Sequence, residues 1–154
     1  MKINVGEKAP MFTGLNQNGQ TTSLESFRGK KLILFFYPQD NTPTCTVEAC
    51  NLRDHYMELK SAGYELLGVS ADLQKKHQNF IKKFNLPFDL IADTEREIIN
   101  AFGVWGEKKT FGKTYDGIHR TTYVIGESGK IINRIDGVKS KNHAQQILDG
   151  QIEY

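Results

Sequence analysis

The hydrophobic pattern is dominated by one unbroken apolar run, from Leu32 to Tyr37. Such a run indicates a strand that is buried on both faces, as in a parallel sheet covered by helices. A polar loop with two prolines follows, and apolar residues then recur at intervals of three and four, the spacing of one helix face. That face comprises Cys45, Ala49, Leu52, Tyr56 and Leu59. The pattern therefore predicts a central strand that leads through a loop into a helix.

The start of this helix can be placed at Pro43. Thr42 is a favourable N-cap residue, and Pro43 then occupies the first helical position, where its missing N–H costs nothing. We expect the helix to end at Ala62, with Gly63 as its left-handed cap. Cys45 then lies in the first turn, where free N–H groups and the helix dipole favour the nucleophilic thiolate over the thiol.

The residues before the central strand predict an N-terminal extension. Asn18-Gly19 is a strong hairpin signal, and it separates residues 12–17 from residues 20–23. Residues 24–30 then predict a short turn of helix that leads to the central strand.

Strands and helices alternate after the Cys45 helix, which is the rhythm of a parallel sheet. The expected strands are residues 64–70, 88–92, 121–125 and 131–135. The expected helices are residues 71–85, 93–102 and 142–148, the first capped by Asp72 and the second by Asp93 and Thr94. Residues 127–130 form so short a join that the last two strands are expected to be antiparallel.

This order predicts the α/β thioredoxin-like fold, with a central mixed sheet flanked by helices and preceded by an N-terminal β-hairpin extension. We expect residues 1–154 to form one domain, since this length suffices to bury about 68–70% of the unfolded surface. Residues 103–117 interrupt the alternation with glycines, one tryptophan and three lysines. We interpret them as a solvated basic loop in preference to a dedicated anion site.

Composition narrows the function classes. A net charge of +2 is too small to indicate a nucleic acid or a charged membrane surface as partner. The chain has no run of about 18 apolar residues, so no transmembrane helix is predicted. Residues 1–10 lack the apolar core of a secretory signal, so we expect a cytoplasmic location. Two cysteines in a reducing compartment are more often reactive than structural, and with four scattered histidines they do not predict a metal site.

The loop and the helix start carry a family resemblance. The pattern Pro38-x-x-x-Thr42-x-x-Cys45 resembles the active-site motif of the peroxiredoxins. The longer run 37–54, with Cys50 five residues after Cys45, is similar to the bacterioferritin-comigratory (Q-type) subgroup, and residues 6–12 resemble the usual opening of the family. Two residues depart from the subgroup, because Thr44 replaces a common glycine and Gln39 replaces a frequent lysine. These departures affect expectations about substrate preference and rate.

The resemblance implies a thiol-dependent peroxidase without a cofactor, acting on hydrogen peroxide and organic hydroperoxides. It implies that Cys45 attacks the peroxide and becomes a sulfenic acid, and that Cys50 resolves it as a Cys45–Cys50 disulfide. Thioredoxin or a similar thiol reductant is the implied partner. We expect a monomer, with a weak dimer as the alternative, and no nucleic acid or membrane partner.

Peroxide reduction needs a thiolate aimed along the O–O bond and groups that stabilise charge on both oxygens. Thr42 lies three residues before Cys45, so its hydroxyl can reach the sulfur or the first peroxide oxygen. Pro38 is expected to shield the thiolate from water. The backbone N–H groups near Thr44 and Cys45 are expected to act like an oxyanion hole.

A permanent positive charge is expected to complete the site, and Arg120 is the candidate. It begins the strand 121–125, which lies beside the central strand in the thioredoxin order, and residues 117–123 resemble the segment that carries the peroxiredoxin arginine. A surface ion pair is the alternative for an arginine at a strand edge. Glu48, one turn after Cys45, is expected to hold the arginine or the loop, with a solvated helix position as the alternative.

The spacing of the cysteines predicts a conformational change. On one continuous helix, residues 45 and 50 differ by about 7.5 Å of rise and about 140° of direction, so their Cα atoms lie roughly 8–9 Å apart. A disulfide needs Cα atoms within about 7 Å. The first turn or more must therefore unwind before the disulfide can form. The alternative is that Cys50 is a packed helix residue and that an external thiol resolves Cys45.

Two other functions fit the same fold. A dithiol–disulfide oxidoreductase relies on C-x-x-C, whereas four residues separate the two cysteines here. A non-enzymatic binding or chaperone module requires that Cys45 be unreactive. Peroxide consumption, insulin disulfide reduction and alkylation at mildly acidic pH distinguish the three.

Overall fold

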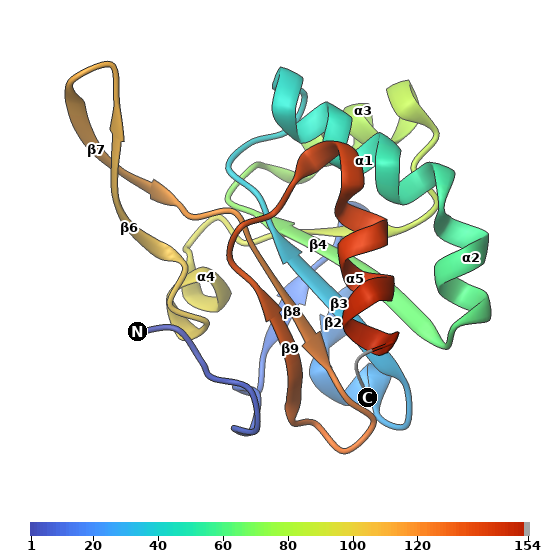
Figure 1. The fold of residues 1–154 in the computed structure, drawn as a ribbon. Helices are drawn as coiled ribbons and strands as arrows, with labels where there is room; N and C mark the ends of the chain where they lie inside the picture. The colour runs from blue at the N-terminus through green and yellow to red at the C-terminus, as the bar shows by residue number, and fades with distance from the viewer. Residues whose placement is uncertain (153–154) are drawn as a thin grey trace.

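The apolar run forms the middle strand of a five-stranded mixed sheet (Figure 1). The structure is a computed structural model, and it describes residues 1–152. The strands in sheet order are β5 (Asp89–Ala92), β4 (Tyr64–Ser70), β3 (Lys31–Phe36), β8 (Thr121–Ile125) and β9 (Ile131–Ile135). β3 pairs in parallel with β4 and antiparallel with β8, and β8 pairs antiparallel with β9. This arrangement confirms the thioredoxin-like fold and the expected last hairpin.

Both faces of β3 are buried, which explains its unbroken apolar run. Leu32, Leu34 and Phe36 pack into a core beneath the N-terminal extension and α4 (Glu97–Ala101). Ile33 and Phe35 face the opposite way, into a core covered by the other helices. Successive residues of a strand point to opposite faces, so a strand between two helical layers must be apolar at every position.

The N-terminal extension contains the expected hairpin. β1 (Thr13–Leu15) and β2 (Thr21–Ser23) pair antiparallel, and Gly19 adopts a positive φ of 74° in the turn between them. The 3-10 helix η1 (Leu24–Phe27) follows, as expected for residues 24–30. The extension therefore covers one face of the sheet and leaves the opposite face to the helices.

The helix that carries Cys45 is interrupted, contrary to the single helix expected up to Ala62. α1 (Pro43–Asp54) ends at His55, whose φ of −106° is not helical, and α2 (Tyr56–Ser61) continues beyond it. The His55 ring donates from Nδ1 to the Asn51 carbonyl at 2.8 Å and so competes for a helical acceptor. Gly63 follows α2 with a φ of 91°, which confirms the left-handed cap.

The caps expected for the next two helices are only partly correct. α3 (Gln74–Phe84) begins later than expected and Asp72 does not cap it, because the Asp72 carboxylate accepts from the Asp40 backbone and the Ser70 hydroxyl. α4 also begins later than expected. The Asp93 carboxylate nevertheless accepts from the Ile99 backbone N–H at 2.8 Å, so it does bind the start of this helix.

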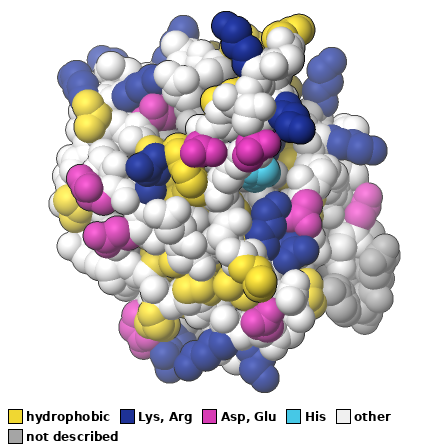
Figure 2. All heavy atoms as spheres, turned by 90° about the vertical axis from the view of Figure 1, so that its left-hand side faces the viewer, with side chains coloured by type: hydrophobic (Ala, Val, Ile, Leu, Met, Phe, Trp, Pro, Cys, Tyr) yellow, Lys and Arg dark blue, Asp and Glu magenta, His cyan; other side chains and the backbone are white. Residues whose placement is uncertain are grey.

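Residues 103–117 were wrongly expected to form a loop. β6 (Trp105–Thr110) and β7 (Lys113–Ile118) form an antiparallel ribbon that projects from the body of the molecule (Figure 1). Phe111 and Gly112 both have positive φ and form its two-residue turn. On the side of the molecule that bears the ribbon, basic side chains are interspersed with acidic ones (Figure 2).

The chain closes with the 3-10 helix η2 (Ser140–Asn142) and with α5 (His143–Ile152), slightly later than the helix expected at residues 142–148. Asn51 of α1 holds this junction, because its side chain donates to the Lys141 carbonyl at 2.9 Å and accepts from the Ala144 N–H at 2.8 Å. Within residues 1–152, no helix is long and apolar enough to cross a membrane.

Gly68 provides a test of the packing of the central sheet. A Cβ atom at this position in β4 would lie 2.6 Å from Leu90 Cδ2 and 2.8 Å from Phe35 Cζ. Both neighbours are almost completely buried, so neither can turn out into solvent to make room. We therefore expect Gly68→Ala to lower the free energy of unfolding by about 1–3 kcal/mol, the usual effect of overpacking, as measured by urea unfolding.

Gly137→Ala is the matched control, because a Cβ atom there meets no atom within 4 Å. Its free energy of unfolding should stay within about 0.5 kcal/mol of the parent protein. Equal stability of the two variants would contradict tight packing around Gly68.

Candidate active site

Cys45 lies at the start of α1, directly after the loop 37–42 that leaves β3. Its side chain is 2% exposed. Thr42 is the N-cap residue, as predicted, and its Oγ1 accepts a hydrogen bond from the Cys45 N–H at 3.3 Å. Pro43 occupies the first helical position. The sequence Thr-Pro therefore begins the helix just before the cysteine and places its sulfur in the first turn.

Arg120 supplies a positive charge at the sulfur, as predicted. Its Nη2 donates to Cys45 Sγ at 3.2 Å, and its Nη1 donates to the Glu48 carboxylate. Burial would lower the pKa of Arg120, but the charges of Glu48 and Cys45 outweigh burial, so its pKa is raised above the ordinary value. The guanidinium is therefore a permanent cation, and the expected alternative of a surface ion pair does not apply.

The pairing of β8 with β3 explains how two residues 75 positions apart meet. Thr121 is the register partner of Phe36, the last residue of β3. Arg120 precedes Thr121, so it lies at the edge where β3 leaves the sheet and the active-site loop begins.

Glu48 is buried, with 1% of its surface exposed, so it is not a solvated helix residue. Besides its bond to Arg120, its Oε2 lies 3.0 Å from His143 Nδ1. The two atoms are close, but neither makes a hydrogen bond within residues 1–152 in this geometry. The other ring nitrogen of His143 lies 2.7 Å from Thr122 Oγ1. The sequence interpretation missed His143 and Thr122, because no local pattern links α5 to α1.

The remaining predicted residues surround the loop and its mouth. Pro38 is half-buried, two residues after the end of β3, whereas Gln39 and Thr44 are exposed. A groove of about 460 Å³ begins beside the first turn of α1, and it is lined by Pro43, Thr44, Val47, Lys139, Ser140, Lys141 and Asn142. Thr44, one of the two residues that depart from the subgroup, therefore lies on the wall of this groove.

Cys50 lies on the same helix as Cys45. Both cysteines are free, Cys45 buried and Cys50 half-buried. Because α1 is continuous from Pro43 to Asp54, their Cα atoms are separated by the roughly 8–9 Å expected of helical geometry. The structure therefore brings Thr42, Glu48 and Arg120 to Cys45 but leaves Cys50 apart.

One cluster within residues 1–152 has the composition of a metal site. Potential ligand atoms of Asp40, Asp72 and His77 lie within 4.8 Å of one another. However, His77 Nδ1 and Asp40 Oδ2 are 2.6 Å apart, the distance of a direct hydrogen bond. Ligands of one zinc ion, each about 2.0–2.2 Å from the metal, would lie roughly 3 Å or more apart. The cluster is therefore a hydrogen-bond network.

Comparisons with known proteins agree with this geometry. The AhpC/TSA family model matches residues 5–134. The putative peroxiredoxin bcp of Haemophilus influenzae is 49% identical over 147 residues, covering 96% of this chain and 95% of that protein. Peroxiredoxin Bcp of Escherichia coli is 43% identical over 147 residues, with 96% and 94% covered.

The fold is also similar to that of a solved structure. The Xanthomonas campestris bacterioferritin comigratory protein, studied for its alkyl peroxide reduction activity in trapped intermediate and ligand complexes, matches with a TM-score of 0.88. It is 30% identical, and the match covers 97% of this chain and 98% of that chain. This chain therefore belongs to the AhpC/TSA family, as a peroxiredoxin of the Bcp type.

Proposed function

We propose that the Cys45 thiolate reduces hydrogen peroxide and organic hydroperoxides. As a peroxiredoxin, the chain is a thiol peroxidase. The observation that carries the assignment to Cys45 is the hydrogen bond of 3.2 Å from Arg120 Nη2 to its sulfur at the start of α1. The alkyl peroxide reduction activity of the Xanthomonas relative supports the substrate class. No contact among the described residues favours a dithiol oxidoreductase or a binding module instead.

The first step transfers one oxygen atom to the sulfur. The thiolate attacks the nearer peroxide oxygen, an S–O bond forms and the O–O bond breaks. The sulfur is oxidised to a sulfenic acid, and the leaving oxygen takes a proton to become water or an alcohol. Arg120 and the N–H groups at the start of α1 stabilise the negative charge that develops on the oxygens. Thr42 Oγ1 accepts from the Cys45 N–H and donates to the Gln39 carbonyl at 3.5 Å, so its proton must turn from this long bond to reach the sulfur or the peroxide.

The other predicted residues shape the site. Pro38 limits the access of water to the sulfur, and Glu48 fixes the orientation of Arg120 through their hydrogen bond. Thr44 lines the groove beside the first turn, where it contributes to substrate preference. The groove also contains the apolar side chains of Pro43 and Val47, which suit the alkyl part of an organic hydroperoxide.

The second step regenerates the thiol. The Cys50 thiolate attacks the sulfenic sulfur of Cys45, the S–O bond breaks as an intramolecular disulfide forms, and the leaving hydroxide takes a proton to become water. Thioredoxin or a similar dithiol protein then reduces this disulfide. The cycle needs no cofactor, and it fits a cytoplasmic enzyme that acts as a monomer or a weak dimer.

The first prediction from this function distinguishes the roles of the two cysteines. Cys45→Ser should abolish peroxide reduction, because it removes the attacking sulfur. Cys50→Ser should consume one equivalent of peroxide and stop at the sulfenic acid, because no second thiol resolves it. Peroxide consumption by the reduced proteins, with intact mass recorded for each, makes the comparison. Turnover by Cys45→Ser at the parent rate would refute the assignment.

The second prediction concerns the charge at the sulfur. Arg120→Ala should lower the second-order rate with peroxide by at least about a hundredfold, the scale of one lost electrostatic donor. Arg120→Lys should recover only part of the rate, because a lysine cannot contact Cys45 and Glu48 together through a planar fork. Stopped-flow measurement of Cys45 oxidation gives the rates.

Arg134→Ala is the matched control for this loss. Like Arg120, Arg134 donates to a carboxylate, that of Asp136, and its second acceptor is the Ile3 carbonyl, but it lies on β9 away from Cys45. Its rate should stay close to that of the parent protein. A rate unaffected by Arg120→Ala would transfer the role to another basic residue.

The third prediction concerns α1 in the oxidised protein. Because the intact helix cannot hold a Cys45–Cys50 disulfide, amides across residues 43–54 should exchange faster and helicity should fall after oxidation. The Ala144 amide should follow, since Asn51 of α1 accepts its hydrogen bond. Hydrogen exchange of reduced and disulfide forms measures both effects, with β3 as the internal reference.

Peptide mapping of the peroxide-treated protein accompanies this measurement. Protection of residues 43–54 that is equal in both forms would refute the unwinding step. Absence of an intramolecular disulfide would show instead that an external thiol resolves Cys45.

A further inference from the structure

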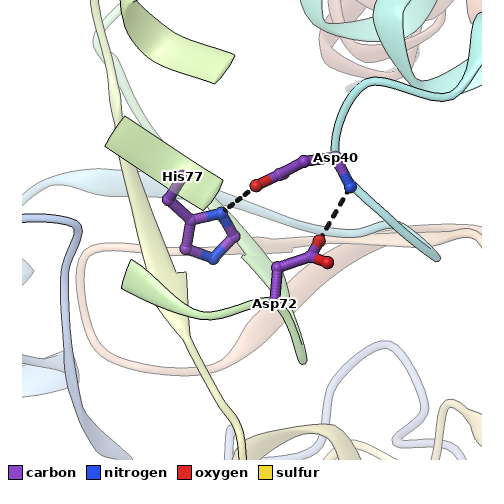
Figure 3. Close-up of side chains that lie close together, drawn as sticks. All are labelled: Asp40, Asp72 and His77. Atoms are coloured by element: carbon purple, nitrogen blue, oxygen red, sulfur yellow. Dashed lines mark hydrogen bonds and ion pairs between the residues drawn. The ribbon is translucent and has the colours of Figure 1, made fainter. Parts of the chain in front are cut away.

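A closed hydrogen-bond network lies behind the active-site loop, on the side away from Arg120. Its centre is formed by Asp40 of the loop, Asp72 after β4 and His77 of α3 (Figure 3). Asp40 is 2% exposed and His77 is completely buried. Asp40 Oδ2 lies 2.6 Å from His77 Nδ1, and the Asp40 backbone N–H donates to Asp72 Oδ2 at 2.7 Å. Hydrogen bonds therefore hold both the side chain and the backbone of Asp40.

Two hydroxyl groups complete the network. Tyr37 Oη donates to the second carboxylate oxygen of Asp40 at 2.5 Å, and Ser70 Oγ donates to Asp72 Oδ2 at 2.7 Å. Burial, and then the charge of Asp40, raise the pKa of Tyr37 well above its ordinary value, so the phenol keeps its proton. Each oxygen of the Asp40 carboxylate thus has its own donor.

His77 connects the loop to the sheet. Its Nε2 lies 2.9 Å from the Ile91 carbonyl of β5, which can only accept, so this nitrogen carries a proton. Its Nδ1 faces the Asp40 carboxylate, so a second proton lies between the two groups. The ring therefore bridges the loop and β5 as one partner of a buried, hydrogen-bonded acid–base pair.

The loop needs such a fixed point, because its conformation is unfavourable by itself. Asn41, between Asp40 and the N-cap residue Thr42, has a φ of 62° in the left-handed region, which asparagine adopts more readily than other residues with a side chain but less readily than the ordinary regions. Strained backbone persists where the residues on either side determine it. Here Asp40 is held by His77 and Asp72, and Thr42 is held by the helix start.

We propose that Asp40 and His77 are positioning residues for peroxide reduction. Their pair fixes the loop 37–42 and, through it, the N-cap Thr42 and the first turn of α1, in the arrangement in which Cys45 reacts. The proposal rests on the thiol peroxidase function proposed above. Neither residue touches Cys45 by any hydrogen bond among residues 1–152, so both act through the loop.

Physical arguments favour this role over one in stability alone. Apolar side chains of similar volume often replace a buried ion pair without loss of stability, whereas directional bonds select one backbone conformation. The network also lies outside residues 43–54, the segment that must unwind to form the disulfide. It can therefore remain in place during the cycle and provide the fixed end from which α1 refolds.

Asp40→Asn is the test variant, because the amide keeps the size of the side chain but removes its charge. Three quantities should be measured: the rate of Cys45 oxidation by hydrogen peroxide in a single turnover, the midpoint pH of Cys45 alkylation, and Tm. We expect the rate to fall about 10- to 100-fold, since a displacement of about 1 Å can cost about a hundredfold. The midpoint pH of alkylation should rise, because the N–H groups at the start of α1 would be less well aligned with the sulfur and would stabilise the thiolate less.

Asp93→Asn is the matched control, because Asp93 is also a buried carboxylate and binds the Ile99 N–H of α4, away from Cys45. It should lower Tm without changing the oxidation rate by more than about twofold or moving the midpoint pH. Tyr37→Phe removes one donor to Asp40 and keeps the ring, so it should reduce the rate less than Asp40→Asn does. It also decides the question if Asp40→Asn does not fold.

A role in stability alone predicts a different result. If Asp40→Asn and Tyr37→Phe lower Tm but keep the parent rate and midpoint pH, as Asp93→Asn should, the positioning role is refuted. Partial recovery of the rate by His77→Asn, relative to His77→Leu, would support it, because asparagine keeps a donor toward Asp40. Failure of the unmodified protein to consume peroxide would instead refute the proposed function, so the two failures are distinct.

Discussion

The contact between the Arg120 guanidinium and the Cys45 sulfur is the interaction on which the site depends. A thiolate that is almost fully buried is unfavourable unless a cation and N–H donors replace the water that it loses. Arg120 has the same difficulty, because it is itself largely removed from solvent, and Glu48 balances its charge. The sequence of alternating charges from sulfur to guanidinium to carboxylate is thus stable only as a whole.

The mixed sheet makes this contact possible. A parallel neighbour returns the chain to the same edge through a crossover, whereas β8 enters antiparallel to β3 and begins where β3 ends. The residue that precedes β8 is therefore placed next to the loop that follows β3. His143 of α5 lies beside Glu48, so parts of the chain from residue 42 to residue 143 contribute to the surroundings of one sulfur atom.

Local signals in the sequence predicted the elements around the cysteine, because capping, proline placement and apolar spacing act over a few residues. The Thr42 cap, the buried β3 and the late hairpin are examples. Arg120 required the family resemblance, since nothing near it distinguishes a buried arginine from an exposed one. Asp72 was misassigned as a helix cap because its carboxylate binds a loop residue 32 positions earlier. His77 and His143 likewise have partners far away in the sequence, Asp40 and Glu48, so no short window of sequence contains both members of either pair.

The two-residue turn of the β6–β7 ribbon was missed for a different reason, since phenylalanine is rarely found at positive φ. The break at His55 was likewise hidden, because apolar spacing continues through it. The break also limits how much of the helix unwinds when the Cys45–Cys50 disulfide forms. α2 is attached to the sheet independently, through the buried Leu59 and the ion pair of 2.7 Å between Lys60 and Glu65. Melting that starts at Pro43 therefore meets a natural boundary after Asp54, and the helical turns beyond it can keep their packing on β4 while the first 12 residues rearrange.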